Sequence, residues 1–120
     1  MKIDITRQPV LVVEDDPLLR LDMALAFSDA GFSVIEAGSA DEALDILNER
    51  SGIALVVTDI EMPGKLDGLK LAEIVSDRWP ETAIFVTSGK IKPAEDTPGR
   101  FFPKPYDSRI IVDEARQIAA

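Results

Sequence analysis

The sequence predicts an α/β fold in which a doubly wound parallel sheet carries helices on both faces. Short, β-branched apolar runs are bounded by turn residues, which is typical of strands buried on both faces. Helical patterns lie between these runs, so strand and helix alternate and favour right-handed βαβ units. The chain has 120 residues and 46% hydrophobic content, which suits a single domain with one core.

The first strand is predicted at the apolar run 10–13, which ends in the acids 14–16. A helix follows because Pro17 suits a first helical position and an apolar stripe continues up to Gly31. The stripe consists of Leu18, Leu21, Met23, Leu25 and Phe27.

The second strand is predicted at residues 32–36. Ser39 is then expected to cap a helix, because Glu42 stands three residues later as in a capping box and apolar residues recur at helical spacing. Gly52 ends that helical unit, and the apolar run 53–59 predicts the third strand.

The third helix is predicted at residues 68–78, where inward-facing apolar positions precede the stop signal Pro80. Residues 83–87 predict a fourth strand and residues 100–102 a short fifth. A last helix is expected at residues 107–119, because apolar residues fall on one face.

The segment between the last two strands breaks the alternation. Residues 88–100 contain two prolines, two glycines and one large apolar residue, so a packed helix is not expected there. We expect instead a mobile loop that becomes ordered when the protein is modified nearby, with a shortened connector that has no role as the alternative.

Composition excludes several classes of function. With 22 acidic and 13 basic residues, the net charge of −9 argues against a nucleic-acid surface or an anionic membrane as partner. The absence of Cys and His removes thiol catalysis, imidazole chemistry and ordinary zinc ligation. No apolar run reaches the roughly 18 residues of a membrane span, so a cytoplasmic protein is expected.

Acidic residues follow two of the predicted strands. Asp59 closes the third strand, and Glu14 and Asp15 follow the first. Because the carboxyl ends of parallel strands open onto one edge, these carboxylates are expected to meet there and repel one another. A divalent cation is their natural partner.

Four stretches at these strand ends carry a resemblance. They are residues 12–17, residues 58–64 with Asp67-Gly68 beyond, residues 86–88 and residues 102–105. In this order the chain resembles, over essentially its whole length, the receiver domain of bacterial two-component response regulators. The resemblance implies a flavodoxin-like sheet in the order 2-1-3-4-5, with Asp15 facing Asp59 at the switch point.

The resemblance also implies a magnesium-dependent phosphorylation site. Asp59 is similar to the family's phosphoacceptor, a carboxylate nucleophile. Asp15 matches the direct Mg²⁺ ligand and Glu14 a ligand through water, with Asp59 and the backbone carbonyl of Glu61 completing the protein's share. Asp16 is interpreted as an acid that stabilises the start of the following helix.

Three further residues match family positions. Lys104 would supply positive charge to Asp59 and to a phosphoryl oxygen, and Thr87 a hydroxyl to the phosphoryl group. Phe101 stands at the aromatic switch position, although a plain core aromatic is the alternative.

The resemblance implies a sensor histidine kinase or histidine phosphotransfer protein as partner, and since this chain has no histidine, the phosphohistidine must come from that other protein. The resemblance implies a regulator that catalyses only its own phosphorylation and dephosphorylation, with an unknown downstream protein target.

The chain also departs from the family pattern. Lys104 stands 17 positions after Thr87, fewer than in most receivers, so the family's fourth helix is expected to be short or missing. The side chain of Glu61 lies beside the expected phosphorylation site. We expect one receiver domain over residues 1–120, with residues 1–7 a candidate disordered stretch and no output domain. Met1 favours a stand-alone regulator over an excised domain.

Two other functions remain open. A pseudo-receiver would keep the fold as a protein-binding module without the switch. A magnesium-dependent phosphohydrolase with an aspartate nucleophile also uses acids at strand ends, but 120 residues leave no room for a cap or substrate pocket.

Overall fold

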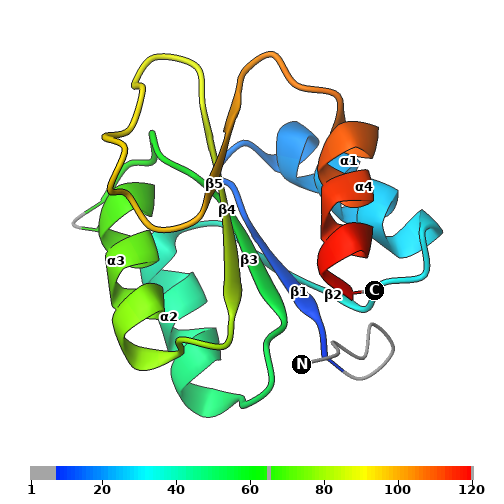
Figure 1. Cartoon of the computed structure of the whole chain (residues 1–120), viewed down its shortest axis with the longest axis horizontal. Helices are drawn as coiled ribbons and strands as arrows, with labels where there is room; N and C mark the ends of the chain where they lie inside the picture. Colours follow the sequence, from blue (N-terminus) through cyan, green and yellow to red (C-terminus); the bar gives the residue numbers. More distant parts are fainter. Residues whose placement is uncertain (1–7, 65, 120) are drawn as a thin grey trace.

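The computed structural model describes residues 8–64 and 66–119, so the predicted disordered stretch 1–7 lies outside the described residues. Five parallel strands form one sheet in the predicted order, β2-β1-β3-β4-β5. The strands are β1 (Val10–Val13), β2 (Val34–Ala37), β3 (Leu55–Asp59), β4 (Ala83–Ser88) and β5 (Arg100–Pro103). The helices are α1 (Pro17–Asp29), α2 (Ala40–Glu49), α3 (Gly68–Arg78) and α4 (Ser108–Ala119). Helices α1 and α4 cover one face of the sheet, and α2 and α3 cover the other (Figure 1).

Local signals set the helix starts. The side chain of Asp16 accepts a hydrogen bond from the backbone N–H of Leu18 at 2.9 Å, and Pro17 follows it at the first helical position. Ser39 Oγ accepts from the N–H of Glu42 at 3.1 Å, as predicted for the cap of α2. In both loops the chain leaves a strand end and enters a helix within a few residues, which keeps the carboxyl edge of the sheet compact.

The core consists of two layers because strand side chains alternate between the sheet faces. In β1, Leu11 and Val13 face the layer under α2 and α3, whereas Val10 and Val12 face the layer under α1 and α4. All four are buried, as expected for a central strand covered on both sides.

The apolar stripe predicted on α1 is only partly buried. Leu18, Leu21 and Leu25 are 78%, 48% and 51% exposed. Met23 and Phe27 fill the core instead, and they lie on the opposite side of the helix. The helix is apolar nearly all round and the sheet covers one side of it, so the leucine face remains uncovered within the described chain.

The predicted absence of a helix between β4 and β5 is confirmed. Residues 89–99, all of them described, contain no helix, and the label α4 therefore belongs to the last helix. Figure 1 shows this segment arching from the end of β4 over the side of α3 before it enters β5. Gly99 makes that return possible: its φ is +95°, and an added Cβ would lie 2.5 Å from the carbonyl oxygen of Ile84.

Gly68 holds the start of α3 against the end of β3. Its N–H donates to the carbonyl of Ile60 at 3.2 Å, and an added Cβ would lie 2.0 Å from the carbonyl oxygen of Asp59. Because that obstacle is backbone, we expect Gly68→Ala to lower the free energy of unfolding by about 1–3 kcal/mol or more. Denaturant titration checks this, with Gly89→Ala as control because its Cβ would meet side-chain atoms no closer than 3.5 Å. Equal midpoints for both variants would contradict the close packing.

Candidate functional site

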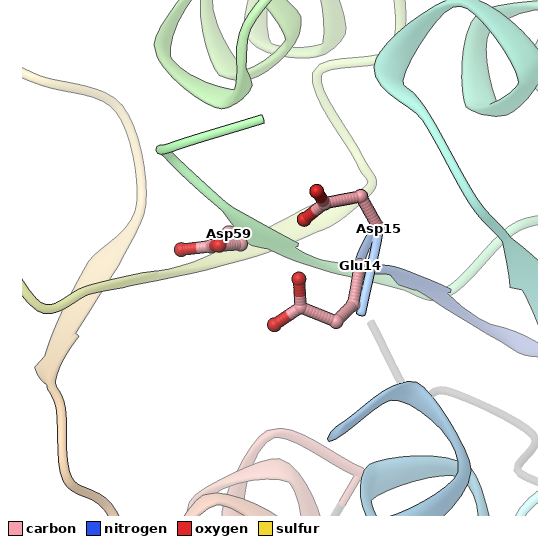
Figure 2. Close-up of side chains that lie close together, drawn as sticks. All are labelled: Glu14, Asp15 and Asp59. Carbon is pink, nitrogen blue, oxygen red and sulfur yellow. The ribbon is translucent and has the colours of Figure 1, made fainter. Parts of the chain in front are cut away.

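Three acidic side chains meet at the carboxyl ends of β1 and β3. One carboxylate oxygen from each of Glu14, Asp15 and Asp59 lies within 4.8 Å of the other two. Figure 2 shows all three side chains projecting from the neighbouring ends of these strands. Glu14 and Asp59 are buried and Asp15 is exposed, so the cluster is open to solvent on the side of Asp15. The sequence predicted this grouping.

Lys104 lies between the two buried acids. Its Nζ donates to Asp59 Oδ2 at 3.1 Å and to Glu14 Oε1 at 3.4 Å. The residue reaches this position because β5 ends at Pro103 and the backbone N–H of Lys104 donates to the carbonyl of Ser88 at 2.8 Å. A cis peptide bond joins Lys104 to Pro105. The lysine therefore neutralises part of the charge of the acids across the sheet.

The second oxygen of Asp59 has no protein partner. Among the described residues, Asp59 Oδ1 is the one buried side-chain polar atom without a hydrogen bond. Leaving a buried carboxylate oxygen unpaired is costly, so this oxygen is suited to contact a water molecule, a cation or another ligand. An oxygen-only donor set with one open side fits Mg²⁺, which prefers carboxylates and keeps several waters.

The electrostatics of the cluster are those of crowded acids. Burial, the charge of Asp59 and a hydrogen bond with Asp15 raise the pKa of Glu14 to about 7. Burial also raises the pKa of Asp59; the hydrogen bond and charge of Lys104 oppose this, and the charges of Glu61 and Asp15 add to it. Burial acts to lower the pKa of Lys104, but its contacts with Asp59 and Glu14 outweigh that and raise it. Lys104 is one positive charge against the three acids of the cluster, so it neutralises only part of their negative charge.

Thr87 lies beside Asp59 in the sheet. The two residues are paired in the register of β3 and β4, and both line a small cavity together with Glu14. The carbonyl of Thr87 accepts from the N–H of Ile60 at 2.9 Å, which ties β4 to the loop after Asp59. The structure thus places Thr87 next to the predicted phosphoacceptor.

The side chain of Phe101 lies on the opposite face of β5 from that of Phe102. It is half-buried and paired with Val86, whose side chain belongs to the core layer under α2 and α3. Phe102 is the buried aromatic, paired with Thr87 and packed on Phe85 at a ring-centroid distance of 5.0 Å. Phe101 therefore lies on the face of the sheet that carries α2 and α3.

The side chain of Glu61 does not join the acid cluster. Its carboxylate accepts hydrogen bonds from Ser88 Oγ and from the backbone N–H groups of Gly89 and Lys90, at the start of the segment that follows β4. The role predicted for its backbone carbonyl, as a metal ligand, stays a prediction. Asp16 acts as the cap of α1, as interpreted from the sequence.

Two residues near the site were not anticipated. Arg20 Nη1 donates to the carbonyl of Glu14 at 2.8 Å, and its Nε lies 3.4 Å from a carboxylate oxygen of Glu36, so it fixes the end of β1. Tyr106 lines the cavity beside Asp59, and burial with the charge of Glu14 raises its pKa to about 12. Neither residue belongs to a local motif; a polar residue one helical turn into α1 was the only available signal for Arg20.

Comparison with known proteins agrees with the sheet and the site. The family model of the response regulator receiver domain matches residues 10–98. The sensor kinase CckA of Brucella abortus is 30% identical over 116 residues, which cover 91% of this chain and 12% of that protein. The aerobic respiration control protein ArcA of Escherichia coli is 32% identical over 114 residues, 91% of this chain and 47% of that protein. The chain thus spans less than half the length of these relatives.

Solved structures show the same fold. A response regulator receiver protein from Sinorhizobium medicae has a TM-score of 0.85 at 25% identity, covering 97% of both chains. The response regulator protein TrrA from Thermotoga maritima, solved in complex with Mg²⁺ and BeF, has a TM-score of 0.82 at 22% identity and covers 92% of this chain and 98% of its own. Within the described residues, none of the helices combines the length and apolar character needed to cross a membrane. The family model covers most of the chain and the fold agrees with it, so this chain belongs to the response regulator receiver domain family.

Proposed function

We propose that this receiver domain is a phosphoacceptor switch that takes a phosphoryl group onto Asp59 from the phosphohistidine of a sensor histidine kinase or a histidine phosphotransfer protein. The observation that carries the proposal is that Oδ1 of Asp59 is buried and unpaired. Asp59 lies next to two other acids, and Lys104 bonds to its other oxygen, Oδ2. Lys104 holds one oxygen of this carboxylate, and the other oxygen is available to a ligand.

The chemistry required of Asp59 is that of a nucleophile. A carboxylate oxygen forms a bond to phosphorus while the P–N bond of the phosphohistidine breaks, and the freed imidazole takes a proton from solvent. Lys104 favours the ionised, nucleophilic form of Asp59, because its hydrogen bond and its charge act against the burial that raises the pKa of this carboxyl.

The acids around Asp59 would hold Mg²⁺. Asp15 and Asp59 offer direct carboxylate ligands, Glu14 a contact through water, and the Glu61 carbonyl a further oxygen. When bound, Mg²⁺ supplies positive charge to the oxygens of the transferred group. Arg20 supports this set because it holds the end of β1, from which Glu14 and Asp15 project.

Lys104 and Thr87 would hold the transferred group on the protein. The Lys104 ammonium already reaches Asp59, and Thr87 is its neighbour across the sheet. Charge and hydrogen bonds placed before the reaction starts are the main source of rate enhancement in phosphoryl transfer. The donor has to approach from the carboxyl edge of the sheet, where Leu18 in the first turn of α1 offers it an exposed apolar contact.

Incubation with acetyl phosphate, with Mg²⁺ or with EDTA, tests the proposal by intact mass. We expect one phosphoryl group per chain with Mg²⁺ and none with EDTA. Failure to add phosphate under both conditions would favour the pseudo-receiver, a binding module. Steady phosphate release from an unrelated phosphomonoester would favour the phosphohydrolase.

Asp15→Asn is expected to reduce Mg²⁺ affinity on the order of tenfold or more, and phosphorylation with it, because a neutral amide replaces the exposed ligand of the cluster. Titration with Mg²⁺, followed by NMR, measures this. Asp16→Asn is the matched control, since asparagine keeps the helix cap and removes a neighbouring charge. Equal Mg²⁺ affinity in the two variants would place the metal elsewhere.

A further inference from the structure

The carboxylate of Glu61 is bound to the beginning of the segment that replaces a helix. Gly89 N–H and Lys90 N–H donate to Oε1 at 3.0 and 3.1 Å, and Ser88 Oγ donates to Oε2. Ser88 Oγ in turn accepts from the N–H of Ile91 at 2.9 Å. One side chain thus organises the turn in which β4 ends, directly and through Ser88.

This contact joins two parts of the chain that are distant in sequence. Glu61 follows the predicted phosphoacceptor by two residues, whereas residues 89–99 arch over the side of α3 (Figure 1). Residues 89–91 are exposed, so side-chain packing contributes little to fixing the position of this end of the segment. The conformation of the turn therefore depends on where the Glu61 carboxylate lies.

The position of that carboxylate depends on the charge at Asp59. The negative charge of Glu61 raises the pKa of Asp59, which shows that the two groups repel each other. Burial acts to raise the pKa of Glu61, but its hydrogen bonds with Ser88, Gly89 and Lys90 and the charge of Lys104 outweigh this and lower it. The positive charge of Lys104 thus stabilises the ionised forms of both Asp59 and Glu61.

A phosphoryl group on Asp59 would change this balance. It exchanges one negative charge for roughly two and draws Lys104 toward its own oxygens. The phosphoryl group then repels the Glu61 carboxylate more strongly, while Lys104 offsets less of that repulsion. Because Glu61 is half-buried, its carboxylate can move into solvent instead.

We propose that the side chain of Glu61 is a latch that holds residues 88–91 while Asp59 is unmodified and releases them when Asp59 carries a phosphoryl group. This inference rests on the proposed function for its trigger, but the latch itself exists in the unmodified protein. The direction is the reverse of the ordering expected from the sequence alone, because the sequence could not show that this turn is already tied down.

Amide hydrogen exchange, followed by NMR, tests the latch directly, since Gly89, Lys90 and Ile91 donate to side chains. In the unmodified protein, Glu61→Ala should speed exchange at Gly89 and Lys90 roughly tenfold, the factor for losing a charge-assisted hydrogen bond. Glu81→Ala, which removes an exposed glutamate before β4, should leave both amides unchanged. Slow exchange that persists in Glu61→Ala would overturn the latch.

Mg²⁺ with beryllofluoride, a stable mimic of the phosphoryl group, tests the release. The wild-type amides of Gly89 and Lys90 should exchange roughly tenfold faster with the mimic. Glu61→Gln keeps an acceptor oxygen without the charge, so its amides should stay protected in both states. Unchanged wild-type protection despite resonance shifts at Asp59 would refute the latch and leave the proposed function standing. Absence of any shift would count against both.

Discussion

Asp59→Asn is expected to abolish phosphorylation altogether. The amide has nearly the shape of the carboxylate but is not a nucleophile, and it removes the acid to which Lys104 is bonded. Because Asp59 is 4% exposed and paired in register with Thr87, a substitution of equal shape should keep the sheet intact. After incubation with acetyl phosphate and Mg²⁺, the intact mass of this variant should be that of the unmodified chain.

The matched control for this experiment is Asp77→Asn, which neutralises an exposed acid on α3. It should accept one phosphoryl group at the rate of the wild type. Circular dichroism of both variants establishes that they are folded. A full phosphoryl group on Asp59→Asn would show that another residue is the acceptor.

Glu14→Gln is expected to stabilise the metal-free protein above neutral pH. Glu14 is 6% exposed, and burial, the charge of Asp59 and the Asp15 hydrogen bond raise its pKa from 4.5 to about 7. A carboxyl with a raised pKa contributes its full stability below pH 4.5, and that contribution is lost as the pH rises through about 7. At about 1.4 kcal/mol per pKa unit, ionised Glu14 costs the fold at most about 3.5 kcal/mol.

Denaturant titrations in EDTA at acidic and alkaline pH measure this cost. Wild type and Glu14→Gln should have similar stability near pH 4.5 and diverge as the pH rises through 7, with the variant the more stable. Added Mg²⁺ should stabilise the wild type more than the variant. Glu73→Gln, an exposed acid on α3, serves as control. If the stability of wild type and Glu14→Gln changes with pH in the same way, the surroundings of Glu14 do not raise its pKa.

Much of the site could be predicted because it is built from strand ends. A buried strand is visible as an apolar run, and parallel strands bring their last residues to one edge, so Asp59 and Glu14 were expected to meet before any coordinates were known. The missing helix was also predictable, because prolines and glycines in residues 89–99 forbid one. The order of the strands came from the family resemblance and not from the pattern.

The remaining features depend on tertiary contacts that local patterns do not encode. An apolar stripe on α1 was visible in the sequence, but the pattern could not show which side of a helix that is apolar nearly all round the sheet would cover, and Leu21 of that stripe lies outside the core. The bond between Glu61 and Ser88 joins residues 27 positions apart across β3 and β4. Arg20 likewise reaches its carbonyl only because α1 folds back on the end of β1.

The most direct test of the account is to locate the acceptor residue. The wild-type protein is incubated with acetyl phosphate and Mg²⁺, reduced with borohydride, which converts an aspartyl phosphate to homoserine, and mapped by peptide mass spectrometry. The account predicts conversion at Asp59 alone, and none when EDTA replaces Mg²⁺. Conversion at Asp15 or another acid, or the same yield at Asp59 without any metal, would contradict it.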